Sequence, residues 1–229
     1  MIDVLYEDDV LLFVNKPPRL VVQRGYDPDE PTLLELASAH VGQPVHLLQR
    51  LDRGTSGVIF FSKSSKINGK ITRQFETKRI RKTYLALCDG ELAERQTIDA
   101  PLIRVGAIKF AVGDNGRRAV THLEPLSPTA NGSLLRILLE TGRTHQIRVH
   151  LSAIGHPLLG DWLYGDRASA ERPMLHAASL EMTHPVTRQA LQVAAPLAAD
   201  FAEEASQRGI VIRYRLPVIE PSNRITDNG

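Results

Sequence analysis

Residues 49–57 read Gln-Arg-Leu-Asp-Arg-Gly-Thr-Ser-Gly and lead directly into the run Val-Ile-Phe-Phe at 58–61. Because β-branched and aromatic residues favour strands, we expect residues 58–61 to form a strand and the polar segment before it to form a loop. Asp52 lies between Arg50 and Arg53 in that loop. Positive charges within a few ångströms favour an ionised carboxylate, so we expect Asp52 to be charged.

Two interpretations of Asp52 follow from this loop alone. An ionised aspartate on a glycine-containing loop can act as a nucleophile, a base or an electrostatic stabiliser. The same pattern also arises from an ordinary turn aspartate paired with an arginine. Gly54 and Gly57 predict a tight backbone, and close approach of a ligand is one reason for such a backbone.

A second segment, residues 140–151, reads Glu-Thr-Gly-Arg-Thr-His-Gln-Ile-Arg-Val-His-Leu. We expect a helix over 144–154, ended by Gly155. One face of that helix carries three apolar residues, namely Ile147, Leu151 and Ile154. Another face, rotated by roughly 100° or more, carries three polar residues, namely His145, Arg148 and Ser152. The polar face either lies in solvent or points toward a site.

The remaining periodicity predicts more strands than helices. Runs of β-branched and apolar residues predict strands at 11–14, 83–88, 119–126, 134–140, 190–194 and 210–216, with a turn-rich connection over 127–133. Helical spacing and capping residues predict helices at 32–41, 64–77 and 197–208. Strands and helices do not alternate, which favours an α+β fold with a mostly antiparallel mixed sheet and flanking helices.

Composition narrows the functional classes. The chain has 229 residues, 42% of them hydrophobic, enough for one large domain or two small ones. No apolar run has the length of a membrane span, and four acidic residues among the first fourteen do not suit a secretory signal. We therefore expect a cytoplasmic protein that does not enter membranes.

The sequence also gives no support for a bound cofactor. Cys88 is the single cysteine, which rules out an internal disulfide and a cysteine-based metal site. The eight histidines are scattered, and none has the His-Glu-x-x-His spacing. Neither a dinucleotide-binding nor a phosphate-loop glycine motif occurs. We expect no metal and no nucleotide cofactor.

Basic residues concentrate in one part of the chain, although the net charge is only +2. Eight of them lie between residues 63 and 82, with Glu76 as the only acid: Lys63, Lys66, Lys70, Arg73, Lys78, Arg79, Arg81 and Lys82. A one-sign run of this length indicates a polyanion nearby, whereas a solvated face usually carries both signs. RNA or DNA is therefore the favoured partner, with a merely basic surface as the alternative.

Taken together, these segments resemble the RluA family of RNA pseudouridine synthases. The resemblance rests on six stretches that occur in the family's order: 14–17 (Val-Asn-Lys-Pro), 50–57, 82–86 (Lys-Thr-Tyr-Leu-Ala), 141–161, 175–177 (Leu-His-Ala) and 184–185 (His-Pro). They span residues 6 to about 196, which is most of the chain. The resemblance implies a pseudouridine synthase catalytic domain over 1–217 and a polar tail over 218–229.

Roles for individual residues follow from the resemblance. Asp52 matches the essential catalytic aspartate, and Arg50 matches the arginine that enters the RNA stack where the target base leaves. Tyr84 matches the tyrosine that stacks on the flipped base, and Arg148 matches the arginine paired with the catalytic carboxylate. Ile147 and Leu175 lie in the same motifs, and their positions there imply that they form the walls of the pocket.

The resemblance implies an isomerase that flips a uridine out of structured tRNA or rRNA, breaks its glycosidic bond and rejoins the base through carbon. No atom is gained or lost, so no cofactor is required. Whether Asp52 attacks the base, attacks the sugar or stabilises a cleaved intermediate stays open. We expect a monomer that reads its RNA with the catalytic domain alone, because the family's frequent N-terminal RNA-binding module has no counterpart before residue 6.

The chain departs from the family pattern at three positions. Gln49 stands where histidine is usual, Gly54 where a polar residue is common, and Arg19 where glycine is common. None of them carries an assigned role, but they leave the shape of the RNA groove, and so the target site, open. The alternatives are a glycoside hydrolase, which normally needs two carboxylates, and a non-catalytic RNA-binding relative, which is expected to lack Asp52 or Arg148.

Overall fold

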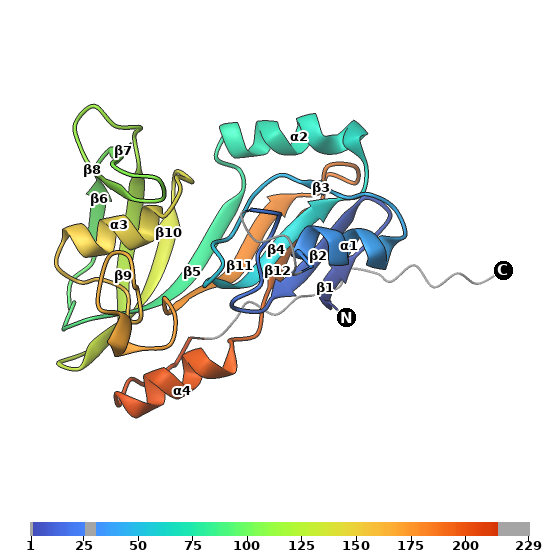
Figure 1. The fold of residues 1–229 in the computed structure, drawn as a ribbon. Coiled ribbons are helices and arrows are strands. Elements are labelled where there is room, and N and C mark those ends of the chain that lie inside the picture. The colour runs from blue at the N-terminus through green and yellow to red at the C-terminus, as the bar shows by residue number, and fades with distance from the viewer. Residues whose placement is uncertain (1, 26–30, 215–229) are drawn as a thin grey trace.

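The structure, a computed structural model, describes residues 2–25 and 31–214 (Figure 1). The strands in these ranges are β1 (Asp3–Glu7), β2 (Leu11–Lys16), β3 (His46–Leu47), β4 (Ser56–Ser62), β5 (Arg81–Cys88), β6 (Gln96–Asp99), β7 (Leu102–Arg104), β8 (Phe110–Val112), β9 (Val120–Thr129), β10 (Gly132–Leu139), β11 (Leu175–Thr183) and β12 (Ala190–Ala194). The helices are α1 (Leu33–Val41), α2 (Ser65–Glu76), α3 (Gln146–Ala153) and α4 (Ala199–Gln207), with a short 3-10 turn at Arg167–Ser169.

Ten of these strands form one continuous sheet. Its order is β1-β2-β4-β11-β5-β10-β9-β6, with β3 paired to β4 and β12 paired to β11. The pairing of β4 with β11 is parallel, and the other pairs are antiparallel. β7 and β8 form a separate hairpin. The prediction of an α+β fold with a mostly antiparallel mixed sheet is therefore confirmed.

Two lobes share this sheet (Figure 1). The first lobe contains β1 to β4, β11 and β12 with α1 and α2, and the second contains β6 to β10 with α3, while β5 runs between them. α2 lies along the upper side of the first lobe in this view, and the β7–β8 hairpin projects from the second lobe on the same side. The loop before β4, the middle of β5 and the start of α3 thus border the space between the lobes.

Local sequence accounts for the helix boundaries of the first lobe. Thr32 and Glu35 form a capping box, since the Thr32 hydroxyl accepts from Glu35 N at 3.3 Å and the Glu35 carboxylate accepts from Thr32 N at 2.9 Å. Gly42 ends α1 in the left-handed conformation, at φ 75°. Ser64 caps α2. The helices expected over 32–41 and 64–77 are therefore confirmed.

The core of the first lobe joins α2 to the sheet. Phe60 on β4 stacks between Phe13 on β2 and Phe75 on α2, with ring centroids 5.2 Å and 6.3 Å apart. Ile67 and Ile71 complete the buried stripe of α2. Because this stripe faces the sheet, the opposite face of α2, which carries Lys and Arg residues, is directed to solvent.

The structure corrects three sequence-based boundaries. Residues 127–133 mostly continue β9 and β10 instead of forming a long turn, because the two strands pair as far as Thr129 and Gly132. The helix expected from residue 144 begins at Gln146, because His145 is left-handed at φ 56°. Residues 210–214 of the strand expected over 210–216 are not extended into a strand.

Two further points concern predicted segments that lie outside the described residues and strands that the sequence did not predict. Residues 215–216 and the tail at 218–229 lie outside the described residues. The strands β1, β3, β6, β7, β8 and β11 were not predicted; the first five have only two to five residues, which leave too little periodicity in the sequence. Within residues 2–25 and 31–214, no helix is long and apolar enough to cross a bilayer.

Candidate active site

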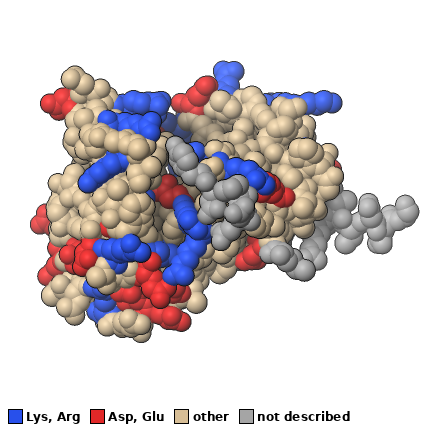
Figure 2. Space-filling model, in the orientation of Figure 1, with Lys and Arg blue, Asp and Glu red and all other residues tan. Residues whose placement is uncertain are grey.

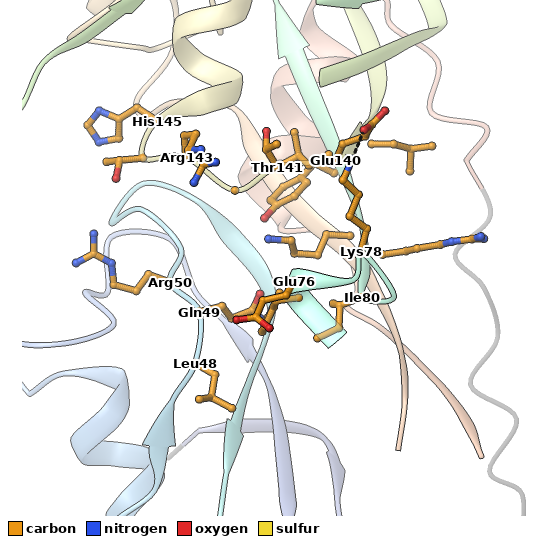
Figure 3. Close-up of a pocket in the computed structure, with 18 of the residues that line it drawn as sticks. Leu48, Gln49, Arg50, Glu76, Lys78, Ile80, Glu140, Thr141, Arg143 and His145 are labelled. Atoms are coloured by element: carbon orange, nitrogen blue, oxygen red, sulfur yellow. Dashed lines mark hydrogen bonds and ion pairs between the residues drawn. The ribbon is translucent and has the colours of Figure 1, made fainter. Parts of the chain in front are cut away.

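A cleft of about 900 Å³ lies between the two lobes. Residues 48–50 form one wall and residues 140–145 the opposite wall, with Glu76, Lys78 and Ile80 closing one end (Figure 3). A recess of about 70 Å³ continues from the cleft. The recess is lined by all six residues that the sequence singled out, namely Arg50, Asp52, Tyr84, Ile147, Arg148 and Leu175. Residues far apart in the chain are thus brought to one place.

Asp52 lies in the recess, where its side chain is 31% exposed. Its Oδ2 atom is 3.5 Å from Nη1 of Arg148 and 3.9 Å from Nε2 of His145. Both neighbours come from the start of α3, so the loop before β4 and the helix after β10 meet at this carboxylate. Arg148 therefore faces the recess, so of the two alternatives left open for the polar face of this helix, the one pointing toward a site holds for Arg148.

Arg148 grips a different carboxylate with its planar fork. Its Nε and Nη2 atoms donate to Oδ2 and Oδ1 of Asp161, each at 2.7 Å. Asp161 is fully buried and also accepts the backbone N–H groups of Leu163 and Tyr164. The contact with Asp52 that the resemblance implies is thus a single one, from Nη1 at 3.5 Å. Asp161 ends the quoted motif, but nothing in its spacing indicated a partner.

The Arg148–Asp161 pair fixes the charge beside Asp52. Burial acts to lower the pKa of the Arg148 guanidinium, but the hydrogen bonds and charge of Asp161, followed by the charge of Asp52, outweigh it and raise that pKa above its ordinary value. The Arg148 guanidinium also stacks over the Tyr164 ring, 5.1 Å from its centroid. Because both oxygens of Asp161 are engaged and buried, this second carboxylate is not available as a glycosidase partner for Asp52.

Two buried basic side chains, Lys16 and Arg172, bind backbone carbonyl groups of the loop that carries Asp52. Nζ of Lys16 donates to the carbonyl oxygens of Pro17 and Leu20, at 2.8 Å each, and of Arg53 at 3.1 Å. Burial lowers the pKa of Lys16 to about 7, helped by the charge of Arg172 and opposed by that of Asp52. Lys16 thus binds the carbonyl oxygen of Arg53, and Arg172 binds that of Gly54. Both residues that follow Asp52 are therefore held through their backbone.

Arg172 connects the same loop to the last helix. Its Nη1 donates to the Gly54 carbonyl at 2.8 Å, while Nε and Nη2 donate to the two oxygens of Asp200 on α4, at 2.6 and 2.8 Å. The Arg172 side chain is 3% exposed. Neither Lys16 nor Arg172 was assigned a role from the sequence, although Lys16 lies in the quoted Val-Asn-Lys-Pro stretch.

The structure explains why residue 57 is a glycine, which the sequence alone did not reveal. Its φ is 107°, and a Cβ atom there would lie 2.2 Å from the backbone oxygen of Ala177. Gly57 and Ala177 are paired residues in the parallel ladder of β4 and β11. The close approach inferred from Gly57 is therefore to a neighbouring strand. At Gly54, a Cβ atom would meet the Pro173 ring at 3.0 Å.

The walls of the recess are buried and mostly apolar. Tyr84 on β5 is 6% exposed, and Ile147 and Leu175 are each 4% exposed. Burial, together with the charge of Asp52, raises the pKa of the Tyr84 hydroxyl above its ordinary value, so it stays protonated at neutral pH. A flat ligand in this recess meets an aromatic ring, aliphatic side chains and a carboxylate.

Arg50 lies at the mouth of the recess, where its side chain is exposed. Figure 3 shows it on the wall opposite Arg143 and His145. The cleft carries five cations, Arg50, Lys78, Arg81, Lys82 and Arg143, and three carboxylates, Asp52, Glu76 and Glu140. Its lining is therefore net positive, which suits a polyanion.

The basic face of α2 continues this charge beyond the cleft. Lys66, Lys70 and Arg73 are all exposed on that helix. Lys70 makes one hydrogen bond, from Nζ to the Pro185 carbonyl at 3.3 Å. Lys and Arg side chains stand on both sides of the hollow between the lobes (Figure 2).

The described part of the chain contains no group of three or more His, Cys, Asp or Glu side chains placed to hold a metal ion. Arg148, the cation beside Asp52, is paired with the buried Asp161. What the arrangement offers chemically is one partly exposed carboxylate beside a fixed cation, in a recess walled by an aromatic ring and aliphatic side chains.

Comparisons with known proteins agree with this geometry. Residues 10–153 match the family described as RNA pseudouridylate synthase. Ribosomal large subunit pseudouridine synthase D of Nitrosomonas europaea is 38% identical over 216 residues, covering 87% of this chain and 63% of that protein. tRNA pseudouridine synthase C of Pasteurella multocida is 36% identical over 220 residues, covering 85% of this chain and 90% of that protein.

A solved structure shows the same fold. Human RNA pseudouridylate synthase domain containing 1 superposes with a TM-score of 0.73 at 28% identity, covering 86% of this chain and 84% of that one. The chain spans less than two thirds of the Nitrosomonas europaea protein, but the family match alone includes the Asp52 loop, Tyr84 and Arg148. The resemblance drawn from the motifs is confirmed, and the chain belongs to the RNA pseudouridylate synthase family, a family of isomerases.

Proposed function

We propose that this chain converts uridine to pseudouridine in structured tRNA or rRNA, with Asp52 as its catalytic residue. The observation that carries the proposal is the position of Asp52, a partly exposed carboxylate beside Arg148 at the floor of a positively charged cleft. The relatives named above are a ribosomal large subunit enzyme and a tRNA enzyme, which supports both RNA classes as candidates.

The proposed reaction begins with base flipping. A uridine inside a folded RNA is stacked, so it must leave the stack before its glycosidic bond is accessible, at a cost of a few kcal/mol. Arg50, exposed at the mouth of the recess, is suited to fill the gap because a guanidinium group can both stack and donate hydrogen bonds. The flipped uracil then stacks on Tyr84 between the walls made by Ile147 and Leu175.

Arg148 places a fixed positive charge beside Asp52. Its Nη1 atom lies 3.5 Å from the carboxylate, and Asp161 holds the guanidinium in place. The two groups thereby present a carboxylate with an oriented cation to the bound nucleotide.

The RNA backbone is proposed to cross the cleft and the exposed face of α2. Phosphate groups are recognised mainly by Lys and Arg, and these side chains line both regions. Because the reaction is an isomerisation, we propose that it needs neither a metal nor a nucleotide cofactor. All six site residues come from one chain, which supports a monomer, and RNA substrates support a cytoplasmic location.

Tritium release tests the proposed function. RNA carrying tritium on the uracil carbon that forms the new bond loses the label to water when pseudouridine forms. We expect release with wild-type protein and none with Asp52→Asn, which keeps the size of the side chain but removes its charge. RNA binding of the variant should stay within about tenfold, or 1.4 kcal/mol. Appreciable turnover by purified Asp52→Asn protein contradicts the assignment of Asp52.

A chelation experiment tests the cofactor proposal separately. Full activity is expected after exhaustive chelation and without added nucleotide, with the fold of the RNA held constant. Recovery of activity only upon addition of a divalent metal contradicts that proposal and leaves the assignment of Asp52 untouched.

A further inference from the structure

His145 has an unusual backbone conformation at the edge of the recess. It precedes the first residue of α3 with φ 56°, a left-handed conformation that residues other than glycine rarely adopt. Its side chain does not cap the helix. Such strain is typically kept where a side chain must point into a functional site. His145 lines both the cleft and the recess.

The hydrogen bonds of Tyr164 determine which nitrogen of His145 carries the proton. The backbone N–H of Phe110 donates to the Tyr164 hydroxyl oxygen at 3.0 Å. The same hydroxyl is 2.9 Å from Nδ1 of His145. The Phe110 N–H occupies one lone pair of the hydroxyl oxygen, and the hydroxyl has Nδ1 of His145 within reach as an acceptor for its own proton. A neutral imidazole that accepts at Nδ1 carries its hydrogen on Nε2.

The environment of Nε2 leads to the same tautomer independently. This nitrogen is 3.9 Å from Oδ2 of Asp52. A carboxylate oxygen opposite an N–H group attracts it, whereas a carboxylate opposite a nitrogen lone pair repels it. Burial lowers the pKa of His145, opposed by Asp52 and assisted by Arg148, with smaller contributions from Asp161 and Arg50, so the ring is neutral at neutral pH.

The two donors near Asp52 converge on one of its oxygens. Arg148 Nη1 and His145 Nε2 both face Oδ2, at 3.5 and 3.9 Å. Among the described residues, none has a side-chain donor within hydrogen-bond distance of Oδ1. Catalytic hydrogen bonds are often long before the substrate is bound and shorten in the complex. Both side-chain donors near the carboxylate therefore lie on the side of Oδ2, where they can close on it in the complex.

We propose that neutral His145, with its hydrogen on Nε2, holds the Oδ2 oxygen of Asp52 together with Arg148 and so presents Oδ1 to the flipped nucleotide. Tyr164 is a positioning residue, because it acts through the orientation and tautomer of His145. The inference rests on the proposed function in one respect, namely that Asp52 is the reactive carboxylate. It assigns a role to the polar face of α3, since Ser152 also binds this segment, through the Tyr164 carbonyl at 2.7 Å.

Nitrogen NMR of protein with nitrogen-15-labelled histidine tests the tautomer without reference to activity. The His145 signals are assigned by their absence in His145→Gln. We expect the Nε2–H tautomer in the wild-type protein and a mixture of tautomers in Tyr164→Phe, which lacks the hydroxyl that donates to Nδ1. An Nδ1–H tautomer, or an imidazolium at neutral pH, in the wild-type protein overturns the proposal.

Two substitutions of His145 test its role in the reaction. Asparagine tolerates the left-handed backbone but its amide is too short to reach the position of Nε2, whereas the glutamine amide nitrogen reaches it. We expect His145→Asn to lower kcat by about tenfold to a hundredfold, as for one hydrogen bond to a charged group, with KM little changed. His145→Gln should recover most of that loss.

The outcomes separate the inference from the function on which it rests. Wild-type kcat in folded His145→Asn overturns the role of His145 but leaves pseudouridine synthesis intact. A wild-type protein that has the Nε2–H tautomer yet forms no pseudouridine on tRNA or rRNA overturns the proposed function instead. Equal losses of kcat in the glutamine and asparagine variants also contradict the proposed hydrogen bond.

Discussion

Arg148 contacts Asp161 at 2.7 Å through two nitrogens and reaches Asp52 at 3.5 Å through the third. Asp161 is fully buried, whereas the Asp52 side chain is 31% exposed. The guanidinium group is thus held by a fully buried carboxylate, and its remaining nitrogen is directed to the partly exposed one. A lysine at this position offers a single point charge and cannot make both sets of contacts.

Double-mutant cycles are expected to separate these two pairs. Removing one partner of a buried pair leaves the other uncompensated, so Asp161→Asn should cost about 3 to 5 kcal/mol of unfolding free energy. The coupling of Arg148→Met with Asp161→Asn should lie in the upper part of the range of about 0.5 to 3 kcal/mol. The coupling of Arg148→Met with Asp52→Ala should stay below about 1 kcal/mol, because Asp52 is partly solvated. Urea unfolding measures all three, and equal couplings contradict the prediction.

Arg148→Lys should lose most activity although it keeps the positive charge. Lysine lacks the planar fork that Asp161 binds, so the charge beside Asp52 is no longer fixed. Single-turnover rates of pseudouridine formation measure the effect, with Arg143→Lys as the matched control. Arg143 also lines the cleft, but its Nε donates to the Arg118 carbonyl and its side chain has no ion pair with a carboxylate of the described residues, so we expect a smaller loss there.

Reversing the charge of Lys66, Lys70 and Arg73 to Glu should weaken RNA binding and flatten its dependence on salt. Each phosphate contact that is lost reduces the log–log slope by about 0.7 to 0.9. Binding measured over a range of salt concentrations gives the slope. Arg167→Glu is the control, because Arg167 is exposed on the 3-10 turn and lines neither the cleft nor the recess. An unchanged slope in the triple variant means that α2 is only a solvated surface.

Gly57→Ala should prevent folding or cost more than about 3 kcal/mol, because it adds a backbone clash to a conformation that alanine does not adopt. The Cβ atom would lie 2.2 Å from the Ala177 oxygen at φ 107°. Gly69→Ala is the matched change, since no atom lies within 4 Å of its added Cβ. That substitution should raise the unfolding free energy by about 0.5 to 1 kcal/mol, the helix penalty of glycine. Thermal unfolding of both variants checks the contrast.

The free energy of unfolding should fall as the pH drops below the pKa of a free histidine side chain, about 6.5. His176 is fully buried, with Nδ1 2.9 Å from the Ser56 hydroxyl, and burial lowers its pKa to about 4. Between that value and about 6.5 the unfolded chain binds a proton that the folded protein does not, so stability rises with pH across this window. The contribution, about 3 kcal/mol, is complete above the window and is lost as the pH falls through it.

Urea unfolding at several pH values between about 4 and 6.5 measures how steeply the free energy of unfolding rises with pH. His176→Gln should flatten it, whereas His156→Gln, a change near the surface at the Asp89 carbonyl, should leave it in place. A wild-type slope that persists in His176→Gln assigns the proton uptake to another group.

Sequence reasoning identified the residues that line the recess more completely than the contacts among them. The phase of a helix places Arg148 on a polar face, and this phase is fixed by the apolar residues Ile147 and Leu151, so that part was predictable. The preference of Arg148 for Asp161 was not, because residues thirteen apart across a loop have no periodicity that relates them. The same holds for Arg172 and the Gly54 carbonyl, which are 118 residues apart.

Boundaries were missed where one residue overrides the pattern around it. Local composition favours a helix from residue 144, but the left-handed backbone of His145 delays it to Gln146. Short strands such as β7 and β8 exist because they pair with each other, and three residues are too few to show an alternation. The long elements α2, β4 and β5, by contrast, follow their own periodicity and were predicted with small errors at their ends.

The link from Gly54 through Arg172 to Asp200 has a consequence for the order of events during synthesis. The loop that carries Asp52 is synthesised well before its anchors, because Arg172 follows Gly54 by 118 residues and Asp200 on α4 comes later still. Domains acquire their structure as units when the chain leaves the ribosome, and contacts between distant segments form late. A nascent chain that has not yet released residue 200 therefore carries Asp52 without the contacts that hold its loop, and the recess is complete only after that residue has left the ribosome.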